Sequence, residues 1–308
     1  MRILLIGGNG FIGSHIVRKL LADGHEIVVL DKYPEKYFDP VPEVNFWRGS
    51  ISDKALLTKA LNNVDLVFHL VSTTVPGTSN LDVETDVTDN LLSTLGLLEM
   101  MRKLDVPKLV FLSSGGAVYG NPATNPVIEE APLNPISSYG INKMAIEKYM
   151  ELYQSLHGIQ SVILRPSNPY GPGQSTAGVQ GVIGRFLYQA LKKKPIEIWG
   201  DGEVVRDYIF IDDLVEICAA LTSNFQPGVY NVGSGVGTSI NEIIPIIESA
   251  TNQQLEVVRK PGRPSDVKAI VLDCEKARQT FNWQANYSLL EGVRQHWSWM
   301  KTLSGKLS

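Results

Sequence analysis

Short apolar runs alternate with helical patterns through the first half of the chain. Residues 3–6 and 27–30 are apolar runs, and residues 14–22 between them carry apolar side chains at helical spacing. The alternation continues with apolar runs at residues 66–70, 109–112 and 162–164 and helical patterns at residues 90–104 and 139–157. Because helices connect the strands of a parallel sheet, the pattern predicts an α/β fold with a Rossmann-type, doubly wound parallel sheet.

The pattern changes after Pro166, where the expected elements become shorter and less regular. Residues 168–173 have the composition of a loop, and the later candidates are strands at 196–199, 208–211 and 229–232 and helices at 213–222 and 240–251. We therefore predict a dinucleotide-binding domain at residues 1–166 and a smaller C-terminal substrate-binding α/β lobe over most of residues 167–308. Segments near 200–235 are expected to return to the main sheet.

A glycine turn joins the first predicted strand to the first predicted helix. Gly7 suits a tight turn, Gly10 leaves the backbone open to a pyrophosphate, and Gly13 lets the helix pack closely on the sheet. The backbone of Phe11 and Ile12 would face the same phosphates at the helix N-terminus. The alternative is a glycine-rich turn of another α/β protein, but the flanking strands and helix favour a dinucleotide site.

Asp31 closes the second apolar run, where an acid can accept hydrogen bonds from the adenosine ribose hydroxyls. Its charge would repel a 2′-phosphate, so NAD is expected as the cofactor rather than NADP. The adjacent Lys32 weakens this preference slightly.

Composition and charge exclude several classes of protein. The 308 residues carry a net charge of −4 without a basic run, which argues against a nucleic-acid partner. The two cysteines have no metal-ligand spacing, so no metal site is expected, and Cys218 lies in an apolar run typical of a core. The longest apolar stretches are shorter than the roughly 20 residues that span a bilayer, and Met1 leads directly into a strand. We therefore expect no membrane association and a cytoplasmic location.

Tyr139 and Lys143 share one face of the helix that Ser137 or Ser138 would cap. A lysine ammonium can bind the nicotinamide ribose and lower the pKa of a nearby phenol, which can then remove a proton from a sugar hydroxyl. An exposed pair on an amphipathic helix is the alternative. The strand at 109–112 and the dinucleotide turn favour catalysis.

The glycine spacing G-x-x-G-x-x-G resembles the short-chain dehydrogenase/reductase superfamily. The phrase at residues 7–15 and the S-S-x-x-x-V-Y-G phrase at residues 113–120 are similar to its extended branch, the nucleotide-sugar epimerases and dehydratases. The resemblance runs from residue 3 to about residue 277. It implies NAD-dependent epimerisation of a nucleotide-diphosphate sugar, most like epimerases acting at C4 of UDP-glucose or UDP-N-acetylglucosamine, and a homodimer formed through helices 90–104 and 139–157.

Three positions after the strand at 109–112 refine this implication. The family usually has a catalytic Ser or Thr where this chain has Gly115, so Ser114, a water or the substrate would supply that hydrogen bond, or the reaction is slower or different. In 4,6-dehydratases an acidic pair follows, and decarboxylases carry a Glu, whereas this chain has Gly116 and Ala117. The resemblance thus favours an epimerase over a dehydratase.

The same resemblance assigns binding residues. For the substrate it implies that Asn168 and Arg206 bind the diphosphate, Trp199 lines the base, Arg263 binds phosphate and Asp266 binds the nucleotide ribose. For the cofactor it implies further contacts from Ile51, Leu70, Val71, Ser72, Asn90, Ser113 and Pro166, besides Tyr139 and Lys143. Each arginine taken alone could equally be a solvated surface charge.

Ile270 stands where some UDP-galactose 4-epimerases carry a Tyr that narrows the sugar pocket. This chain could therefore admit an N-acetyl group. The remaining alternatives are an NAD(P)-dependent reductase of a nucleotide deoxysugar, another epimerase, or a non-catalytic protein that senses dinucleotides. The intact Tyr139 and Lys143 pair argues against the last of these.

Overall fold

The computed structural model describes residues 1–36, 38–174, 181–262 and 267–304. The chain forms two compact units, and each is described by itself. Unit 1 comprises Met1–Gly120, Leu133–Arg165 and Val215–Tyr230, and unit 2 comprises Asn121–Pro132, Pro166–Leu214 and Asn231–Ser308.

A seven-stranded sheet with the order β10-β6-β5-β4-β1-β2-β3 forms the centre of unit 1. Its strands are β1 (Arg2–Ile6), β2 (Glu26–Asp31), β3 (Asn45–Arg48), β4 (Leu66–His69), β5 (Lys108–Leu112), β6 (Gln160–Pro166) and β10 (Gly228–Val232). The pairs from β3 across to β6 are all parallel. The order reverses between β1 and β4, as in dinucleotide-binding folds, so the predicted Rossmann-type α/β class is confirmed.

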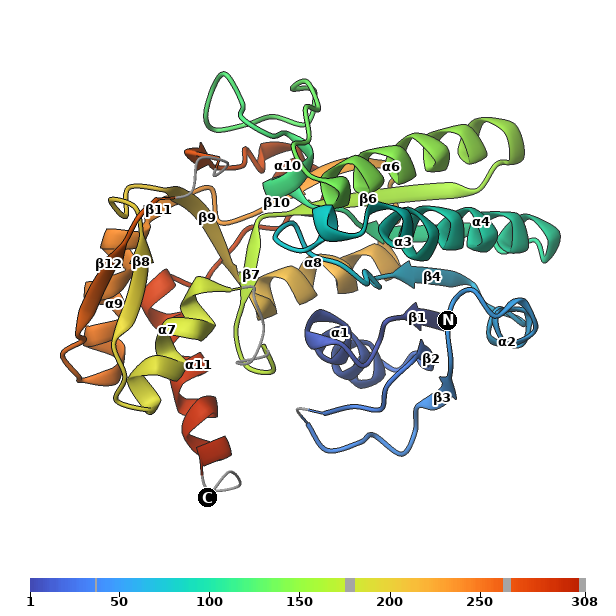
Figure 1. The fold of residues 1–308 in the computed structure, drawn as a ribbon. Helices are drawn as coiled ribbons and strands as arrows, with labels where there is room; N and C mark the ends of the chain where they lie inside the picture. The colour runs from blue at the N-terminus through green and yellow to red at the C-terminus, as the bar shows by residue number, and fades with distance from the viewer. Residues whose placement is uncertain (37, 175–180, 263–266, 305–308) are drawn as a thin grey trace. The chain divides into compact units, whose positions relative to one another are not determined.

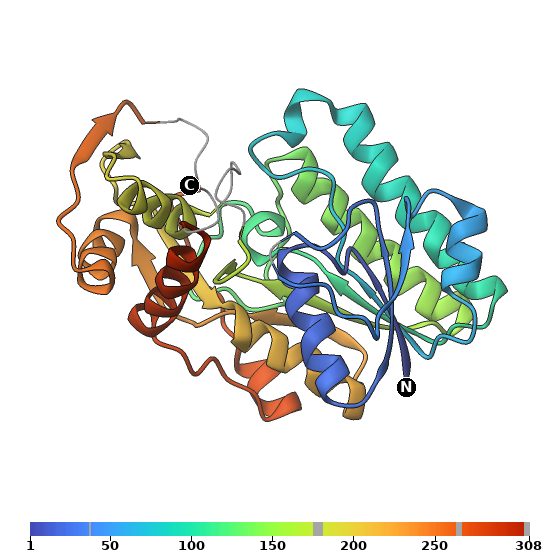
Figure 2. The same cartoon turned by 90° about the horizontal axis from the view of Figure 1, so that it is seen from below.

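Helices cover both faces of this sheet. The principal ones are α1 (Phe11–Ala22), α2 (Lys54–Ala60), α4 (Ser93–Lys103) and α6 (Ser138–His157), with the short α5 (Gly115–Val118) and α8 (Ile211–Ser223), which runs from unit 2 into unit 1. Figure 1 labels these elements, and Figure 2 shows α4 and α6 side by side on one face, with α1 on the other. The glycine turn before α1 and the strand ends next to it therefore lie at the reversal point of the sheet.

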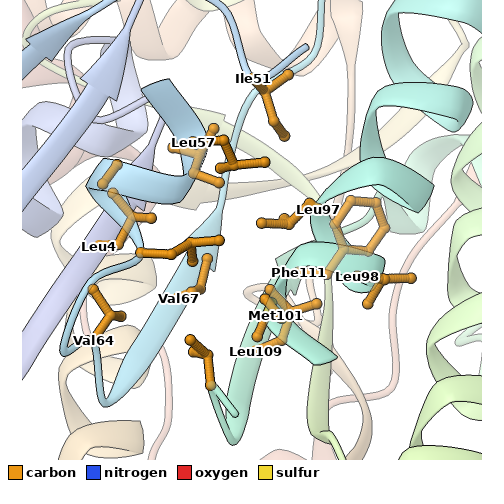
Figure 3. Packing of buried hydrophobic residues seen from close by; sticks show 14 of the residues in the cluster. Leu4, Ile51, Leu57, Val64, Val67, Leu97, Leu98, Met101, Leu109 and Phe111 are labelled. Atoms are coloured by element: carbon orange, nitrogen blue, oxygen red, sulfur yellow. The ribbon is translucent and has the colours of Figure 1, made fainter. Parts of the chain in front are cut away.

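A buried apolar cluster holds α2 and α4 against the sheet (Figure 3). Leu4, Val67 and Phe111 come from three adjacent strands, and Leu57 and Leu97 come from the two helices. These side chains are almost fully buried, and apolar burial is the main favourable term in folding. The cluster fixes the strand ends from which the candidate site is built.

The described residues of unit 2 form smaller sheets and, besides the start of α8, four helices. Its strands are β7 (Asn168–Tyr170), β8 (Ile196–Trp199), β9 (Val205–Phe210), β11 (Gly237–Ser239), β12 (Val257–Lys260) and β13 (Ala269–Ile270). Its helices are α7 (Val182–Leu191), α9 (Ile240–Thr251), α10 (Glu275–Phe281) and α11 (Leu289–Ser304). Of the segments near 200–235, β10 joins the seven-stranded sheet, whereas β9 pairs with β7, β11 and β13.

The start of the helix expected at residues 90–104 differs from the prediction. A 3-10 turn η1 (Ser79–Leu81) and the short α3 (Val83–Asp86) lead into a π-helical segment, η2 (Val87–Leu92), and α4 begins only at Ser93. In this segment the Asn90 side chain donates to the carbonyl oxygen of Asp86 at 3.0 Å. Apolar spacing cannot show such a change in helical pitch, because the same face stays buried.

Two other expectations concern single features. Cys218 is fully buried, as its apolar surroundings predicted. Within the described part of the chain, none of the helices combines the length and apolar character required to cross a bilayer.

Candidate active site

The glycine turn has the shape of a cradle for a dinucleotide. Gly7 has a φ of +86°, and a Cβ there would lie 2.9 Å from the backbone nitrogen of Val71. A Cβ on Gly13 would lie 2.3 Å from the carbonyl oxygen of Gly7, so only glycine fits either position. Gly10, which precedes α1, is different, because a Cβ there would meet protein only at 3.4 Å. The open space at Gly10 fits a close ligand on the backbone.

The N-terminus of α1 faces this cradle. No side chain caps the helix at Gly10, so the first N–H groups, including those of the predicted contacts Phe11 and Ile12, have no side-chain acceptor. Free N–H groups and the helix dipole together favour an anion such as a pyrophosphate.

Asp31, the predicted ribose-binding acid, is the last residue of β2 and lies beside the turn. Its carboxylate accepts hydrogen bonds from the backbone nitrogens of Asn9 at 3.1 Å and Tyr33 at 3.0 Å. These bonds orient the carboxylate while leaving lone pairs for further donors. Lys32 is exposed, and its carbonyl oxygen accepts a hydrogen bond from Arg48.

Ile51 lies next to this end of the sheet but packs into the apolar cluster, with 8% of its surface exposed. Leu70, Val71 and Ser72 follow β4, and Val71 closely approaches Gly7. The structure thus brings the ends of β1 and β4 together, which is where the predicted cofactor contacts lie.

Tyr139 and Lys143 lie one turn apart near the start of α6, where Ser137 caps the helix by accepting from the Gly140 nitrogen at 3.2 Å. The Lys143 side chain is buried, and its Nζ lies 5.6 Å from the Tyr139 ring centroid. The same Nζ donates to the carbonyl oxygen of Leu112 at 2.7 Å. The predicted pair is therefore held against the end of β5.

Ser114 hydrogen-bonds the Tyr139 phenol. It precedes α5 without using its hydroxyl to cap that helix, which leaves the hydroxyl for the phenol. Burial raises the pKa of Tyr139 to about 12, while the Ser114 hydrogen bond acts in the opposite direction because it favours the phenolate. Burial lowers the pKa of Lys143 to about 7, against the carboxylates of Glu147 and Asp86, which raise it.

A buried ion pair joins α6 to β6. Arg165 donates to Glu147 through Nη2 at 2.6 Å and through Nε at 3.1 Å, and it donates to the Tyr119 hydroxyl at 2.8 Å. Ser113 also donates to Glu147, so its hydroxyl is used within the protein. Glu147 was not predicted as a site residue, although its place four residues after Lys143 puts it on the same helix face.

A second polar cluster is centred on Asp86. Asp86, which ends α3, is fully buried and accepts from Ser138 and Asn142 of α6. Asn90, a predicted cofactor contact, also donates to Asp86, and its Oδ1 accepts from the Thr73 nitrogen at 3.0 Å. Its amide therefore supports the protein framework. Asp86 was not foreseen, because nothing in its local sequence marks it.

A small cavity lies beside the Tyr139–Lys143 pair. Its lining includes His69, Asn90, Tyr139 and Lys143, together with Val71 and Ser72. The Thr94 hydroxyl gives its one proton to the Asn90 carbonyl oxygen at 2.6 Å, so His69 Nε2, 2.8 Å away, must donate to Thr94. His69 Nδ1 is then a buried acceptor without a partner among the described residues.

The substrate residues predicted by resemblance lie in unit 2. Asn168 begins β7, and its Nδ2 donates to the carbonyl oxygen of Asp207 at 2.8 Å, which leaves one amide proton and Oδ1 for a ligand. Trp199 ends β8 with 40% of its surface exposed. Arg206 lies in β9, and its Nη1 donates to the carbonyl oxygen of Val205 at 2.8 Å. Arg263 and Asp266 lie outside the described residues.

Pro166, a predicted cofactor contact, is the last residue of β6 and falls in unit 2. Asp207 follows Arg206, is buried, and accepts from the backbone nitrogens of Ser234 at 2.9 Å and Leu272 at 3.3 Å. It therefore fixes the strand that carries Arg206. Among the described residues, no three His, Cys, Asp or Glu side chains are grouped to hold a metal ion.

Comparison with known proteins agrees with this geometry. The model of the NAD dependent epimerase/dehydratase family matches residues 3–233. The UDP-glucose 4-epimerase of Mycolicibacterium smegmatis is 36% identical over 306 residues, covering 95% of this chain and 96% of that protein. The dTDP-4-dehydro-6-deoxyglucose reductase of Escherichia coli is 31% identical over 303 residues, covering 94% and 95%.

Among solved structures, the UDP-glucose 4-epimerase of Thermotoga maritima with UDP-glucose superposes with a TM-score of 0.95 at 34% identity, covering 99% of this chain and all of that one. Both units therefore follow an epimerase fold over their full length. The glycine cradle, the acid at Asp31 and the Tyr139–Lys143 pair occur within the matched region. The chain belongs to the NAD dependent epimerase/dehydratase family, and its cofactor is NAD.

Proposed function

We propose that the protein epimerises a UDP-hexose at C4, interconverting UDP-glucose with UDP-galactose or the N-acetylhexosamine pair. The observation that carries this proposal is the Tyr139 phenol, hydrogen-bonded to Ser114 and one helical turn from the buried Lys143. A phenol so placed is a general base that can return the proton it removes. The 36% identity to a UDP-glucose 4-epimerase supports the choice of substrate class.

Tyr139 is the proposed acid and base. Its phenolate removes the proton of the sugar 4-hydroxyl. Ser114 donates a hydrogen bond that stabilises negative charge on the phenolate oxygen of Tyr139. The Lys143 ammonium favours the phenolate electrostatically and is placed to bind the nicotinamide ribose. Bound NAD supplies reversible hydride transfer at C4. After the 4-keto sugar turns its other face, Tyr139 returns the proton to the new hydroxyl.

The cofactor is proposed to lie along the sheet end. Gly7, Gly10 and Gly13 with the α1 N-terminus would hold the pyrophosphate, and Asp31 the adenosine ribose. A full catalytic cycle regenerates NAD, so the protein has no need to release it between turnovers. A net reductase must exchange its cofactor in every turnover.

Ser114 is proposed to replace the hydroxyl that Gly115 lacks. Its hydrogen bond to Tyr139 places an oxygen beside the base, where the family's usual Ser or Thr would act. Gly116 and Ala117 follow in α5 and offer no carboxylate. Elimination of water from the sugar needs an additional acid and base, so epimerisation fits this site better than dehydration.

The substrate contacts are proposed from unit 2. Asn168, Arg206 and Arg263 would bind the diphosphate, Trp199 would stack on the base, and Asp266 would bind the nucleotide ribose. Trp199 is exposed enough to receive a base, and an acidic chain needs local cations to hold a diphosphate.

We also propose a homodimer formed through α4 and α6. Ile141, Tyr149, Leu152 and Leu156 form an exposed stripe along α6, and each has more than a third of its surface exposed. Leu92, just before α4, is 53% exposed, and α4 lies beside α6 in both views (Figures 1 and 2). Exposed apolar side chains grouped on neighbouring helices are typical of a protein interface, and the occupant proposed here is a second copy of this chain.

The test is proton NMR of the purified protein with NAD and, separately, UDP-glucose and UDP-N-acetylglucosamine, without a reductant. New anomeric signals of the 4-epimer would support the proposal and identify the sugar that fits. The Tyr139→Phe variant should retain NAD and form no epimer. Absence of epimer from both sugars with wild-type protein that contains NAD would overturn the proposal. Turnover of a 4-keto deoxysugar nucleotide only with NADH or NADPH would identify a reductase instead.

A further inference from the structure

Asp86 is the most unusual buried group near the Tyr139–Lys143 pair. It has no exposed surface, and four side chains donate hydrogen bonds to its carboxylate. The donors are Thr74, Asn90 Nδ2 at 2.8 Å, Ser138 Oγ at 2.5 Å and Asn142 Nδ2 at 2.8 Å. None of these four partners carries a charge. A buried carboxylate without a paired cation is costly, and hydrogen bonds from uncharged groups offset only part of that cost.

Two of the donors are sequence neighbours of the catalytic pair in α6. Ser138 immediately precedes Tyr139, and Asn142 immediately precedes Lys143. Ser138 and Asn142 lie four residues apart on one helix face, so both can donate hydrogen bonds to the single carboxylate of Asp86. Asn80 adds a further link, because its Oδ1 accepts a hydrogen bond from the Ser138 backbone nitrogen at 2.8 Å. The first turn of α6 is thereby tied to the segment that contains α3.

The π-helical segment brings the remaining donor into place. Asn90 follows Asp86 by four residues and donates both to its carboxylate and to its carbonyl oxygen at 3.0 Å. The Asn90 carbonyl oxygen in turn accepts from the Thr94 hydroxyl at 2.6 Å. Within the π-helical segment, the Asn90 amide thus faces Asp86, and side-chain donors reach the carbonyl oxygens of Asp86 and Asn90.

The charges around the pair make Asp86 electrostatically distinct. On α6 itself, Glu147 is also buried, but Arg165 of β6 pairs with both of its oxygens. From β4, His69 faces the same cavity, and burial lowers its pKa to about 3, so it is neutral. Asp86 lines the same cavity as Lys143 and Tyr139, and no cation is among its four hydrogen-bond partners.

We propose that Asp86 is a positioning residue of this active site, which fixes Tyr139 and Lys143 through Ser138 and Asn142 and provides the counter-charge of the Lys143 ammonium. The charge has two effects that work against each other. It favours the ammonium on Lys143, and it disfavours the phenolate on Tyr139. Asp86 consequently shifts both ionisations in the same direction. This inference rests on the proposed function only where turnover is measured.

The charge is tested with Asp86→Asn in full-length protein loaded with NAD. Removing a negative charge should lower the pKa of both groups, so both limbs of the kcat–pH profile should move to lower pH by about one unit. Glu84→Gln is the matched control, because Glu84 is an exposed acid of the same helix, and it should leave both limbs in place. Limbs that stay in place in Asp86→Asn would overturn the counter-charge role.

The positioning role is tested with Asn142→Ala and Ser138→Ala, which keep the charge and each remove one donor. Each should lower kcat about tenfold without moving either limb. Full activity in both variants would overturn the positioning role. If Asp86→Asn does not fold, these two variants still decide the positioning role.

A readout without turnover separates this inference from the proposed function. NMR of protein with carbon-13 in the tyrosine ring, assigned with Tyr139→Phe, follows ionisation of the Tyr139 phenol directly. The Tyr139 signal should titrate at lower pH in Asp86→Asn than in wild type, even if no UDP-hexose is a substrate. An unchanged titration would contradict the inference, whereas failure of epimerisation alone would contradict only the proposed function.

Discussion

The Nζ of Lys143 donates a 2.7 Å hydrogen bond to the carbonyl oxygen of Leu112, the last residue of β5. This bond ties α6 to the strand from which the chain continues into Ser113 and Ser114. The spacing between Tyr139 and Ser114 is therefore set by the main chain of the central sheet. It is not left to the flexibility of two side chains. That rigidity is what allows a serine one position away from the family's usual site to reach the phenol.

The first prediction concerns Ser114→Ala. Loss of the hydroxyl should lower kcat about 10- to 100-fold, because a hydrogen bond to a charged oxygen is removed. Since the bond favours the phenolate, its loss should also move the acidic limb of the kcat–pH profile to higher pH. Steady-state kinetics across pH would measure both effects. The exposed Ser52→Ala variant should behave as wild type, and an equally active Ser114→Ala would exclude Ser114 from catalysis.

The parts of this site predicted from sequence are those that local patterns specify. The glycine turn needs three residues in one segment, and Tyr139 and Lys143 need one helical turn. Asp86, by contrast, gains its role from donors up to 56 residues away. Such a role depends on how α3 and α6 pack, which no spacing rule records.

The fold shows the same division. The parallel sheet followed from apolar runs separated by helical patterns, because burial on both faces makes such strands apolar throughout. The partners of β9 could not be foreseen, since a short strand with mixed burial can pair at several edges. The π-helical turn at Val87–Leu92 was missed because its pitch changes while its buried face continues.

The second prediction concerns the ion pair of Glu147 and Arg165. Glu147→Gln leaves a buried guanidinium without its counter-charge, which should cost about 3–5 kcal/mol of unfolding free energy. Urea unfolding followed by circular dichroism would measure the change. The control is Glu151→Gln, which breaks an exposed pair with Lys148 on the same helix and should cost less than about 1 kcal/mol. Equal midpoints for Glu147→Gln and wild type would show that the pair adds nothing to stability.

The third prediction concerns acid sensitivity arising from His296. This residue of α11 is fully buried, and neither ring nitrogen has a partner among the described residues. Burial lowers its pKa to about 3 in the folded protein, from 6.5 when unfolded. Below pH 6.5, His296 therefore binds a proton in the unfolded chain but stays neutral in the folded protein. The free energy of unfolding consequently falls as the pH drops from 6.5 toward 3.

His296→Leu should remove this loss, which amounts to about 1.4 kcal/mol per pH unit in that range. Thermal unfolding between neutral and acidic pH would show a flatter decline of Tm for the variant. Exposed His157→Leu is the control and should follow wild type. Parallel Tm curves for His296→Leu and wild type would mean that His296 is protonated in the folded state.

The fourth prediction concerns the proposed homodimer. Leu156 is 64% exposed on the apolar stripe of α6, so Leu156→Glu would place a charge in the interface. Light scattering after size exclusion should give a dimer for wild type and a monomer for the variant. Ser155→Glu adds the same charge at the neighbouring exposed position and should remain dimeric. A monomeric wild-type protein would refute the interface directly.

The last prediction concerns the choice between hexose and N-acetylhexosamine. Ile270 of β13 is the register partner of Arg206 in β9, so the two residues are neighbours in one sheet of unit 2. If Arg206 binds the diphosphate as proposed, the side chain at position 270 lies near enough to limit the room for the sugar. Ile270→Tyr should then lower kcat/KM for UDP-N-acetylglucosamine more than for UDP-glucose, by about tenfold in the ratio.

Ile270 is 2% exposed, so a larger side chain could also disturb the packing around it. Ile270→Val is therefore the matched variant, because it keeps the shape, reduces the volume and should leave the ratio unchanged. A Tm within a few degrees of wild type would show that Ile270→Tyr is folded. A tyrosine in the wall of the sugar pocket would necessarily narrow that pocket. If the folded Ile270→Tyr protein kept the wild-type ratio of kcat/KM for the two UDP-sugars, position 270 would therefore have no part in substrate selection.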